Sequence, residues 1–305
     1  MSLKKIIKQV TPPAILDAVK SVPGLRWEER TLKKYMRGGR VPWSPGYDIY
    51  RKNIFTQALK DKNLLDRFRN GESLPPGYGI GVDERCVEYP WLFAHLRDEP
   101  EVMLDAGSTL NYDFVLDNPV FRQKIIHILT LAPESNCFWQ KGVSYLYHDL
   151  RDIPIRNSYY DTIVCLSTLE HVGFVAYEKK GILREKRPMD FIIAMRELAR
   201  VLKAGGTFFL TVPFGVYRQY DLFQQFDHKL LSDAIEAFGK ASEMTVTFYR
   251  YTFEGWNVAN AADCAECEYV EWIMLPADKK PDDFSLEPDR AAAARAVACV
   301  KITGA

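Results

Sequence analysis

Acidic residues and glycines stand at the ends of short apolar runs, where they could hold a charged small molecule. The run Glu101–Asp105 is stopped by Ala106-Gly107, and Asp149 follows the run Val143–His148. Ligands of open parallel sheets bind at the carboxyl ends of the strands, and a glycine there lets the backbone pass close to the ligand. A carboxylate at such a position attracts an ammonium group or accepts the proton of an amino group. The pattern therefore predicts a polar ligand site.

Five apolar runs must form the sheet that positions these residues. They are Glu101–Asp105, Lys124–Leu131, Val143–His148, Thr162–Leu166 and Thr207–Val212. Strands that are apolar on both faces and alternate with helices or crossovers indicate a parallel sheet covered on both sides. We therefore expect an α/β fold with a doubly wound, mostly parallel sheet.

Helices are expected around these runs, and two further strands after them. The helical segments are residues 48–70, Glu84–Leu96, Pro188–Lys203, which Gly205-Gly206 should end, and Asp227–Phe238. Met244–Tyr251 and Ala296–Ile302 are typical of strands. They fit an antiparallel pair at the C-terminal edge of the sheet.

The composition excludes several classes of protein. The 305 residues carry 40 Lys and Arg against 40 Asp and Glu, and 47% are hydrophobic, as in ordinary globular chains. No apolar stretch reaches the ~18 residues of a transmembrane helix, and the N-terminus lacks the apolar core of a secretory signal. Six scattered cysteines indicate a reduced, cytoplasmic chain. The lone pair Cys264 and Cys267 lacks the further ligands that zinc needs, so no metal is expected.

Basic residues are concentrated in residues 1–40, which hold ten Lys and Arg against three acids. We take residues 1–75 as a basic helical N-terminal extension and residues 76–305 as the main domain. The basic segment packs on its own domain or on a second subunit, as in a homo-oligomer, which is the interpretation we favour. The alternative is peripheral contact with an anionic membrane at its inner face. No aromatic-basic pattern typical of RNA-binding motifs is visible, so nucleic acid is not an expected partner.

Four segments, in this order and spacing, resemble a class I S-adenosylmethionine-dependent methyltransferase. They are Glu101–Leu110 (EVMLDAGSTL), Val143–Pro154 (VSYLYHDLRDIP), Tyr160–Val172 (YDTIVCLSTLEHV) and Glu197–Gly215 (ELARVLKAGGTFFLTVPFG). The third and fourth, placed behind an Asp-x-Gly strand end, are the most specific, and the resemblance covers roughly residues 84–302. It implies a Rossmann-like methyltransferase domain over residues 76–305 and S-adenosylmethionine as the cofactor.

The resemblance also implies cofactor contacts, residue by residue. Asp105 would attract the ammonium directly or through water, Asp149 would accept the adenine amino proton, and Leu150 would supply a backbone N–H and an apolar wall. For both acids the alternative is helix capping or turn formation. The full set of implied cofactor-binding residues is Asp105, Gly107, Ser108, Thr130, Asp149, Leu150 and Ser167.

Two departures from the family pattern affect this site. The loop over residues 105–111 lacks the usual second and third glycines, so the Ser108 hydroxyl and backbone N–H groups would hold the cofactor carboxylate. At the end of the second strand, Thr130 stands where the family presents Asp or Glu, and the nearest acid is Glu134. Either Thr130 or Glu134 would contact the ribose.

The segment Gly77–Glu88 (GYGIGVDERCVE) precedes the first strand and has three alternate glycines. One interpretation is a lid that folds over the cofactor, with Asp83, Glu84, Arg85 and Glu88 reaching the methionine end or the acceptor. The other is a plain turn followed by a helix. The sequence does not separate the two.

Methyl transfer to a hydroxyl needs a base, and two histidines are candidate catalytic residues. His171 follows the fourth strand and faces the site in the family, although we favour an orienting hydrogen bond as its role. His228 follows the loop Tyr217–Phe226, and we favour a position at a helix N-terminus for it. The candidate substrate-binding residues of that loop are Tyr217, Arg218, Tyr220 and Gln225.

The finer resemblance is to methyltransferase-like proteins that accompany glycosyltransferases of surface-polysaccharide or lipopolysaccharide synthesis. It rests on the segments DAGSTLN, LAPE with CFWQKG, and the ending Ala294–Cys299. It implies O-methylation of a sugar hydroxyl on a glycan or glycolipid precursor. The alternatives are methylation of a small phenol, quinone or carboxylate, and a non-catalytic scaffold that keeps the fold. A deep polar groove favours the first, a closed apolar pocket the second, and a blocked cofactor site the third.

Overall fold

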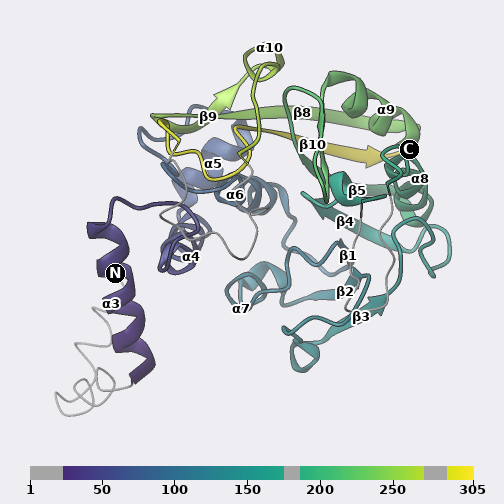
Figure 1. Cartoon of the computed structure of the whole chain (residues 1–305). Coiled ribbons are helices and arrows are strands. Elements are labelled where there is room, and N and C mark those ends of the chain that lie inside the picture. The colour runs from purple at the N-terminus through teal and green to yellow at the C-terminus, as the bar shows by residue number, and fades with distance from the viewer. Residues whose placement is uncertain (1–22, 175–185, 271–286) are drawn as a thin grey trace.

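The sheet runs through the whole main domain. The computed structural model describes residues 23–174, 186–270 and 287–305, which contain an eight-stranded sheet of order β3-β2-β1-β4-β5-β10-β8-β9. Helices cover both of its faces (Figure 1). The parallel strands are β1 (Glu101–Ala106), β2 (Lys124–Thr130), β3 (Val143–Tyr147), β4 (Tyr160–Leu166) and β5 (Leu202–Pro213). This confirms the mostly parallel, Rossmann-like α/β fold.

The C-terminal edge of the sheet is antiparallel. Strand β10 (Ala296–Gly304) lies between β5 and β8 (Ala241–Thr252) and runs antiparallel to both. The expected antiparallel pair is therefore confirmed, and the sequence missed the outermost strand β9 (Gly255–Ala259), which pairs with β8. A second, two-stranded sheet joins β6 (Arg218–Gln219) to β7 (Gln224–Gln225).

Side chains alternate between two hydrophobic cores, one on each face of the sheet. Met103, Val164 and Phe209 belong to the core that holds α5 (Lys62–Asn70) and α6 (Arg85–His95). Their neighbours Leu104, Ile163 and Phe208 belong to the core under α8 (Phe191–Val201) and α9 (His228–Phe238). This period of two is the pattern of strands buried on both faces, and it fixes which side chains stand at each strand end.

Capping side chains set two helix boundaries. Asp227 accepts a hydrogen bond from Leu230 N and begins α9, as expected. Asp61 accepts one from Leu64 N and begins α5. The single helix expected over residues 48–70 is therefore wrong, because the chain forms α4 (Tyr47–Ala58), turns, and starts α5 at its own cap.

The expected end of α8 at Gly205-Gly206 is also wrong. The helix ends at Val201, and Leu202 is already extended, with φ −76° and ψ 139°. Leu202 pairs with Tyr160 of β4, so the chain passes straight from helix to sheet. The two glycines lie inside β5, where the pairing with β4 shifts its register.

The N-terminal helices are α3 (Pro23–Arg37), which projects from the rest of the chain in Figure 1, then α4 and α5. Phe55 of α4 and Phe68 of α5 share one core with Leu92 of α6. Residues 1–22, which carry part of the predicted basic segment, lie outside the described residues. The domain boundary at residue 75, the membrane contact and the homo-oligomer stay predictions. No helix within the described ranges is long and apolar enough to cross a membrane.

Short helices fill the connections. They are α7 (Asp113–Leu116), α10 (Ala261–Cys264) and the 3-10 turns η1 (Pro119–Phe121), η2 (Trp139–Lys141) and η3 (Leu169–His171). Of these, η3 follows β4 directly, so it places its side chains at the carboxyl end of the sheet.

A buried ion pair at the start of β1 and β2 provides a test of the fold. Lys124 Nζ lies 2.7 Å from Glu101 Oε2, and the two side chains are 0% and 3% exposed. Lys124→Met should lower the free energy of unfolding by about 3 kcal/mol, the lower end for a broken buried pair. Among the described residues, the buried carboxylate then keeps only the half-exposed Arg97 as its ion-pair partner. Urea unfolding of the full chain measures this loss.

Lys52→Met is the matched control. Its ion pair with Asp113 joins side chains that are 51% and 57% exposed, so its loss should cost about 1 kcal/mol at most. Equal losses in the two variants would contradict the role given to the buried pair.

Candidate functional site

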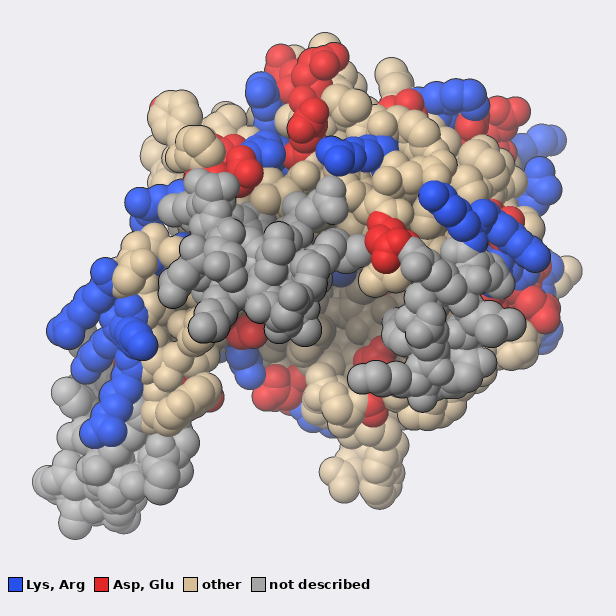
Figure 2. Space-filling view, in the orientation of Figure 1, with Lys and Arg blue, Asp and Glu red and all other residues tan. Residues whose placement is uncertain are grey.

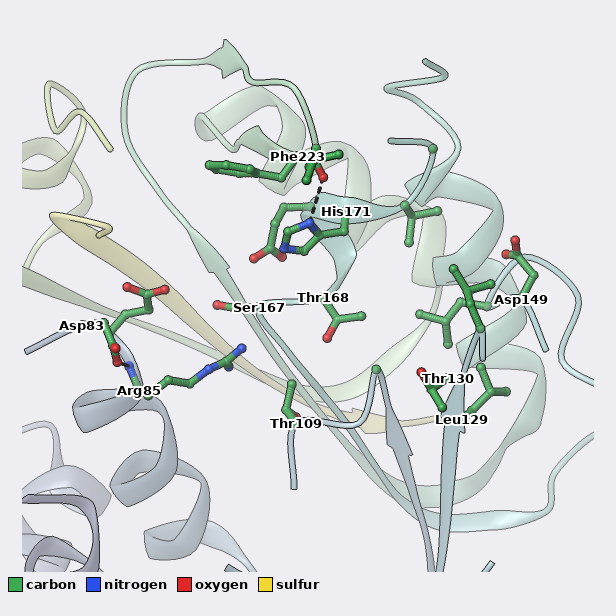
Figure 3. Close-up of a pocket in the computed structure, with 18 of the residues that line it drawn as sticks. Asp83, Arg85, Thr109, Leu129, Thr130, Asp149, Ser167, Thr168, His171 and Phe223 are labelled. Atoms are coloured by element: carbon green, nitrogen blue, oxygen red, sulfur yellow. Dashed lines mark hydrogen bonds between the residues drawn. The ribbon is translucent and has the colours of Figure 1, made fainter. Parts of the chain in front are cut away.

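A cavity of about 580 Å³ opens at the carboxyl ends of β1 to β4, the edge where parallel sheets bind ligands. Figure 2 shows the hollow from outside, and Figure 3 shows side chains that point into it. The lining residues are Trp43, Arg51, Asp83, Glu84, Arg85, Gly107, Thr109, Tyr112, Leu129, Thr130, Leu131, His148, Asp149, Leu150, Arg151, Ser167, Thr168, Glu170, His171, Val172, Gly173, Leu222, Phe223 and Tyr269.

Gly107 forms the turn after β1 and has to be glycine. Its φ is 118°, and an added Cβ would lie 2.1 Å from Thr168 Oγ1. Side chains rarely adopt this φ, and the clash would push Thr168 away from the end of β4. The backbone therefore approaches the cavity here without a side chain in front of it, as a cofactor loop requires.

Asp105 lies beneath this loop instead of in the cavity. It is fully buried, and its carboxylate accepts hydrogen bonds from the N–H groups of Thr109 and Leu110 and from the Thr109 hydroxyl. Burial raises its pKa to about 7, although these hydrogen bonds oppose the rise. Asp105 thus takes the turn-forming role, and the structure does not bring it to the cavity for direct contact with an ammonium.

Glu134 joins the two strand ends at which the sequence departs from the family. Its carboxylate accepts hydrogen bonds from Ser108 Oγ at 2.8 Å, Asn111 Nδ2 at 3.0 Å and Thr130 Oγ1 at 3.1 Å. Thr130 lines the cavity, whereas Ser108 and Glu134 do not. Of the two candidates for the ribose contact, Thr130 is the one that lines the cavity, and Glu134 accepts the hydrogen bond of its hydroxyl; the ribose contact itself stays a prediction.

Asp149 lines the cavity and is held rigidly by Arg151. The arginine donates from Nε and its backbone N–H to Oδ1, and from Nη2 to Oδ2 at 2.7 Å. A further nitrogen, Nη1, binds Asp190 at 2.6 Å. Burial raises the pKa of Asp149, but the hydrogen bonds from Arg151 outweigh it, and the net pKa lies below the usual value. Asp149 therefore presents an ionised carboxylate beside the apolar wall of Leu129, Leu131 and Leu150.

The end of β4 is fixed by a buried carboxylate from α6. Ser167 has a φ of 35°, which is unfavourable for a residue with a side chain. Its N–H donates to the hydroxyl and the carbonyl of Thr211, and its hydroxyl donates to Glu88 at 2.5 Å. Ser167 and Thr168 therefore face the cavity in one defined arrangement.

His171 is fixed as a donor through one ring nitrogen. Its Nδ1 lies 2.8 Å from the carbonyl oxygen of Leu222, so the proton of the neutral ring is on Nδ1. Nε2, which has no hydrogen-bond partner among the described residues, can then accept a proton. Burial lowers its pKa, although the hydrogen bond opposes this. The orienting bond that we favoured from the sequence is present, and it leaves Nε2 in the state that a base needs.

Two buried carboxyl groups share the cavity wall with Arg85. Burial, with smaller contributions from the charges of Asp83 and Glu88, raises the pKa of Glu84 to about 8. Burial also raises the pKa of Glu170 well above its usual value. Glu170 Oε2 has no hydrogen-bond partner among the described residues. This side chain therefore keeps hydrogen-bonding capacity for a ligand in the cavity.

The segment Gly77–Glu88 is a turn and a helix start that also lines the site. Trp256 Nε1 donates to the Val82 carbonyl, and the Tyr251 hydroxyl accepts from Gly81 N. These bonds fix the turn against β8 and β9. The interpretation as a plain turn followed by a helix is supported, while three residues expected of a lid, Asp83, Glu84 and Arg85, line the cavity.

The N-terminal segment adds a wall that the sequence did not indicate. Trp43 donates from Nε1 to the Ala292 carbonyl at 2.6 Å. Arg51 lies over the Trp43 ring, 5.0 Å from its centroid, and binds Asp83 at 2.6 Å. Trp43, Arg51 and Asp83 all line the cavity. No local pattern could have revealed this, because Trp43 meets a partner 249 residues away.

The structure does not bring five of the predicted catalytic or substrate-binding residues to the cavity. His228 begins α9 beside Phe214, which is the helix position we favoured. Gln225 is buried and donates to the Cys267 carbonyl, and Tyr220 stacks on Phe223 at 4.5 Å. Tyr217 and Arg218 are exposed on the hairpin. Leu222 and Phe223, at the tip of the same loop, line the cavity in their place.

Residues 128–210 match the family model described as "Methyltransferase domain". This segment runs from β2 through β4 and α8 into β5, and it includes Thr130, Asp149, Ser167 and His171. No curated protein matches the chain. The fold and this match support an S-adenosylmethionine-dependent methyltransferase domain in this chain, with S-adenosylmethionine as its cofactor.

Solved structures of similar fold include three with different described roles. The cyclase SpnF is 19% identical over 49% of this chain and 54% of its own, about half its length, with a TM-score of 0.34. The Burkholderia thailandensis 1,6-didemethyltoxoflavin-N1-methyltransferase is 11% identical over 97% and 92%, with 0.42. A possible histamine N-methyltransferase from Thermotoga maritima is 13% identical over 83% and 99%, with 0.40. The assignment above does not depend on them.

The variant Glu84→Gln tests the electrostatics of the site through pH. The carboxyl has a pKa of about 8 in the fold and about 4.3 in an unfolded chain. Between these values the folded state keeps a proton that the unfolded state has lost, so wild-type stability falls as pH rises. The variant lacks this dependence. The unfolding free energy of the variant minus that of the wild type should therefore rise by up to about 1.4 kcal/mol per pH unit from about pH 5 to 8.

Denaturant unfolding at several pH values measures this difference. Glu254→Gln serves as the control for the substitution itself, because Glu254 is exposed. A constant difference for Glu84→Gln would show that burial does not hold the proton on Glu84.

Proposed function

We propose that the chain transfers a methyl group from S-adenosylmethionine to a hydroxyl of a sugar, in a glycan or glycolipid precursor. The observation that carries the proposal is the state of His171. Its Nδ1 is committed to the Leu222 carbonyl, and its lowered pKa keeps the ring neutral near pH 7. A neutral imidazole that lines the cavity, and whose Nε2 has no partner in the part of the chain that the structure describes, is the base that a hydroxyl acceptor requires.

The residues present fit the cofactor. The volume of about 580 Å³ lies within the range of small-molecule sites, ~300–1,000 Å³. The close backbone approach at Gly107 suits the methionine end, whereas Asp149 and Leu150 suit the adenine, the carboxylate as acceptor and the leucine as an apolar surface. Thr130 suits the ribose. When bound, the cofactor supplies an electrophilic methyl group.

The chain's own residues then position the acceptor and remove its proton. A hydroxyl that gains a methyl group must lose its proton, and Nε2 of His171 receives it. The Leu222 carbonyl holds the resulting imidazolium in the same orientation through Nδ1. Positioning supplies much of the rate in such a reaction, because the two reactants are already held together.

The lining favours a polar acceptor over an apolar one. Trp43, Phe223 and Tyr269 offer ring faces, and Arg51 and Glu84 offer charged groups. A sugar combines apolar faces with hydroxyl edges, so this mixture suits it. A phenol or quinone would favour a closed apolar pocket, and a scaffold protein would favour a blocked cofactor site. The open, charged cavity supports neither. The proposal includes a cytoplasmic location, with lipid-linked acceptors met at the membrane.

The first test is calorimetric titration with S-adenosylhomocysteine. We expect micromolar binding that Asp149→Ala weakens about 10-fold or more, because the variant removes a charged hydrogen-bond acceptor. Asp190→Ala is the matched control, since Asp190 binds the same arginine but does not line the cavity. If the folded wild type did not bind S-adenosylhomocysteine, the methyltransferase assignment would be wrong.

The second test separates a base from an orienting residue at position 171. In His171→Asn the side-chain amide can still donate to the Leu222 carbonyl, but Nε2 is lost. Methyl transfer to nucleotide sugars and lipid-linked sugars should fall about 100-fold or more, with binding of S-adenosylhomocysteine unchanged. The wild-type rate should also rise with pH through the lowered pKa of His171.

Near-normal activity in this variant would give His171 an orienting role only. Acceptance of small phenols or carboxylates in place of sugars would favour the alternative class of acceptor.

A further inference from the structure

We propose that Arg85 and Glu170 form the subsite for the amino-acid end of the cofactor. The guanidinium would bind the carboxylate, and the Glu170 carboxylate would bind the ammonium. This inference rests on the proposed function, because it concerns the same cavity. It assigns the binding of the two charged groups to side chains of α6 and η3 and not to the loop after β1.

Several polar groups of the loop after β1 already have partners within the fold. The N–H groups of Thr109 and Leu110 bind Asp105, and the Ser108 hydroxyl binds Glu134. Asp105 itself is fully buried and faces the loop. An ammonium in the cavity therefore needs another anion, and a carboxylate needs another cation.

Arg85 supplies the cation. It stands at the first residue of α6, and its side chain extends toward the space between Thr109 and Ser167 (Figure 3). Glu88 binds Nη1 at 2.6 Å, which fixes the direction of the guanidinium. Among the described residues, no hydrogen bond engages its other two nitrogens. An arginine presented in this way can bind a carboxylate through two parallel hydrogen bonds.

Glu170 supplies the anion. Its side chain is 3% exposed and lines the cavity, yet Oε2 meets no donor among the described residues. A buried polar atom without a partner costs free energy, and a donor in the ligand removes that cost. The charge of Arg85 lowers the pKa of Glu170 but less than burial raises it. A bound ammonium would add a second cation and favour the ionised form.

The two residues together match a zwitterion better than either single charge. Arg85 and Glu170 interact electrostatically but form no ion pair with each other among the described residues, so each keeps capacity for a ligand. An acceptor with one amino group would bind Glu170 alone and would make no contact with the charge of Arg85. The amino-acid end of S-adenosylmethionine carries one carboxylate and one ammonium on the same carbon, which uses both.

The experiment compares two ligands on the full chain by calorimetry. S-adenosylhomocysteine carries the amino-acid end, and 5′-methylthioadenosine has the same nucleoside thioether without it. The wild type should prefer S-adenosylhomocysteine by about 100-fold or more. Arg85→Lys and Glu170→Gln should each reduce this preference about 10-fold, the scale of one charge-assisted hydrogen bond, while binding of 5′-methylthioadenosine stays the same. Glu170→Gln keeps the side-chain shape, so a folding defect is not expected.

Arg200→Lys is the control, because Arg200 pairs with a glutamate three residues away as Arg85 does but does not line the cavity, so it should leave the preference unchanged. An unchanged preference in both Arg85→Lys and Glu170→Gln would overturn the subsite. Equal binding of the two ligands by the wild type would overturn it as well. If neither ligand bound the wild type, the proposed function itself would fail, which is a different result from either of these.

Discussion

The buried carboxylate of Glu88 links the elements that form the base of the cavity. Glu88 is fully buried on α6 and accepts hydrogen bonds from Ser167, Thr211 and Arg85 at 2.5, 2.5 and 2.6 Å. It thereby joins the helix before the first strand to the ends of β4 and β5. A buried charge is tolerated when it is paired and fully hydrogen-bonded, and these three donors meet that condition. The unfavourable φ of Ser167 and the direction of Arg85 both depend on it.

The segments that precede the first strand also contribute side chains to the site. The methyltransferase match begins at residue 128, yet Trp43, Arg51 and Asp83 line the cavity alongside the matched residues. The turn before α6 is anchored from the far end of the chain, through Trp256 and Tyr251. An acceptor entering the cavity would meet these earlier residues as well as the strand ends.

Local pattern was sufficient for most of the fold and for part of the site. Apolar runs gave the five parallel strands, and motif order gave Gly107, Thr130, Asp149 and Ser167, which stand at or beside strand ends as the fold requires. It was insufficient wherever a contact spans the chain. Strand β9 follows a tight turn and needs β8 as its partner, and the hairpin after β5 turns Leu222 inward instead of the polar residues expected. Which side of a loop faces a cavity is decided by tertiary packing, and a single sequence does not contain that information in readable form.

The two departures from the family pattern are one structural exchange. The loop after β1 carries Ser108 and Asn111, and both donate to the carboxylate of Glu134. That same carboxylate binds Thr130, which stands where the family presents an acid. The acid of this chain therefore lies in the loop after β2 instead of at the strand end. From there it fixes the loop after β1, which has fewer glycines than the family pattern. A loop fixed by side chains has fewer free backbone N–H groups to offer a ligand, so charge recognition has to come from elsewhere. Arg85 of α6 and Glu170 of η3 line the same cavity, which is why we propose them for that role.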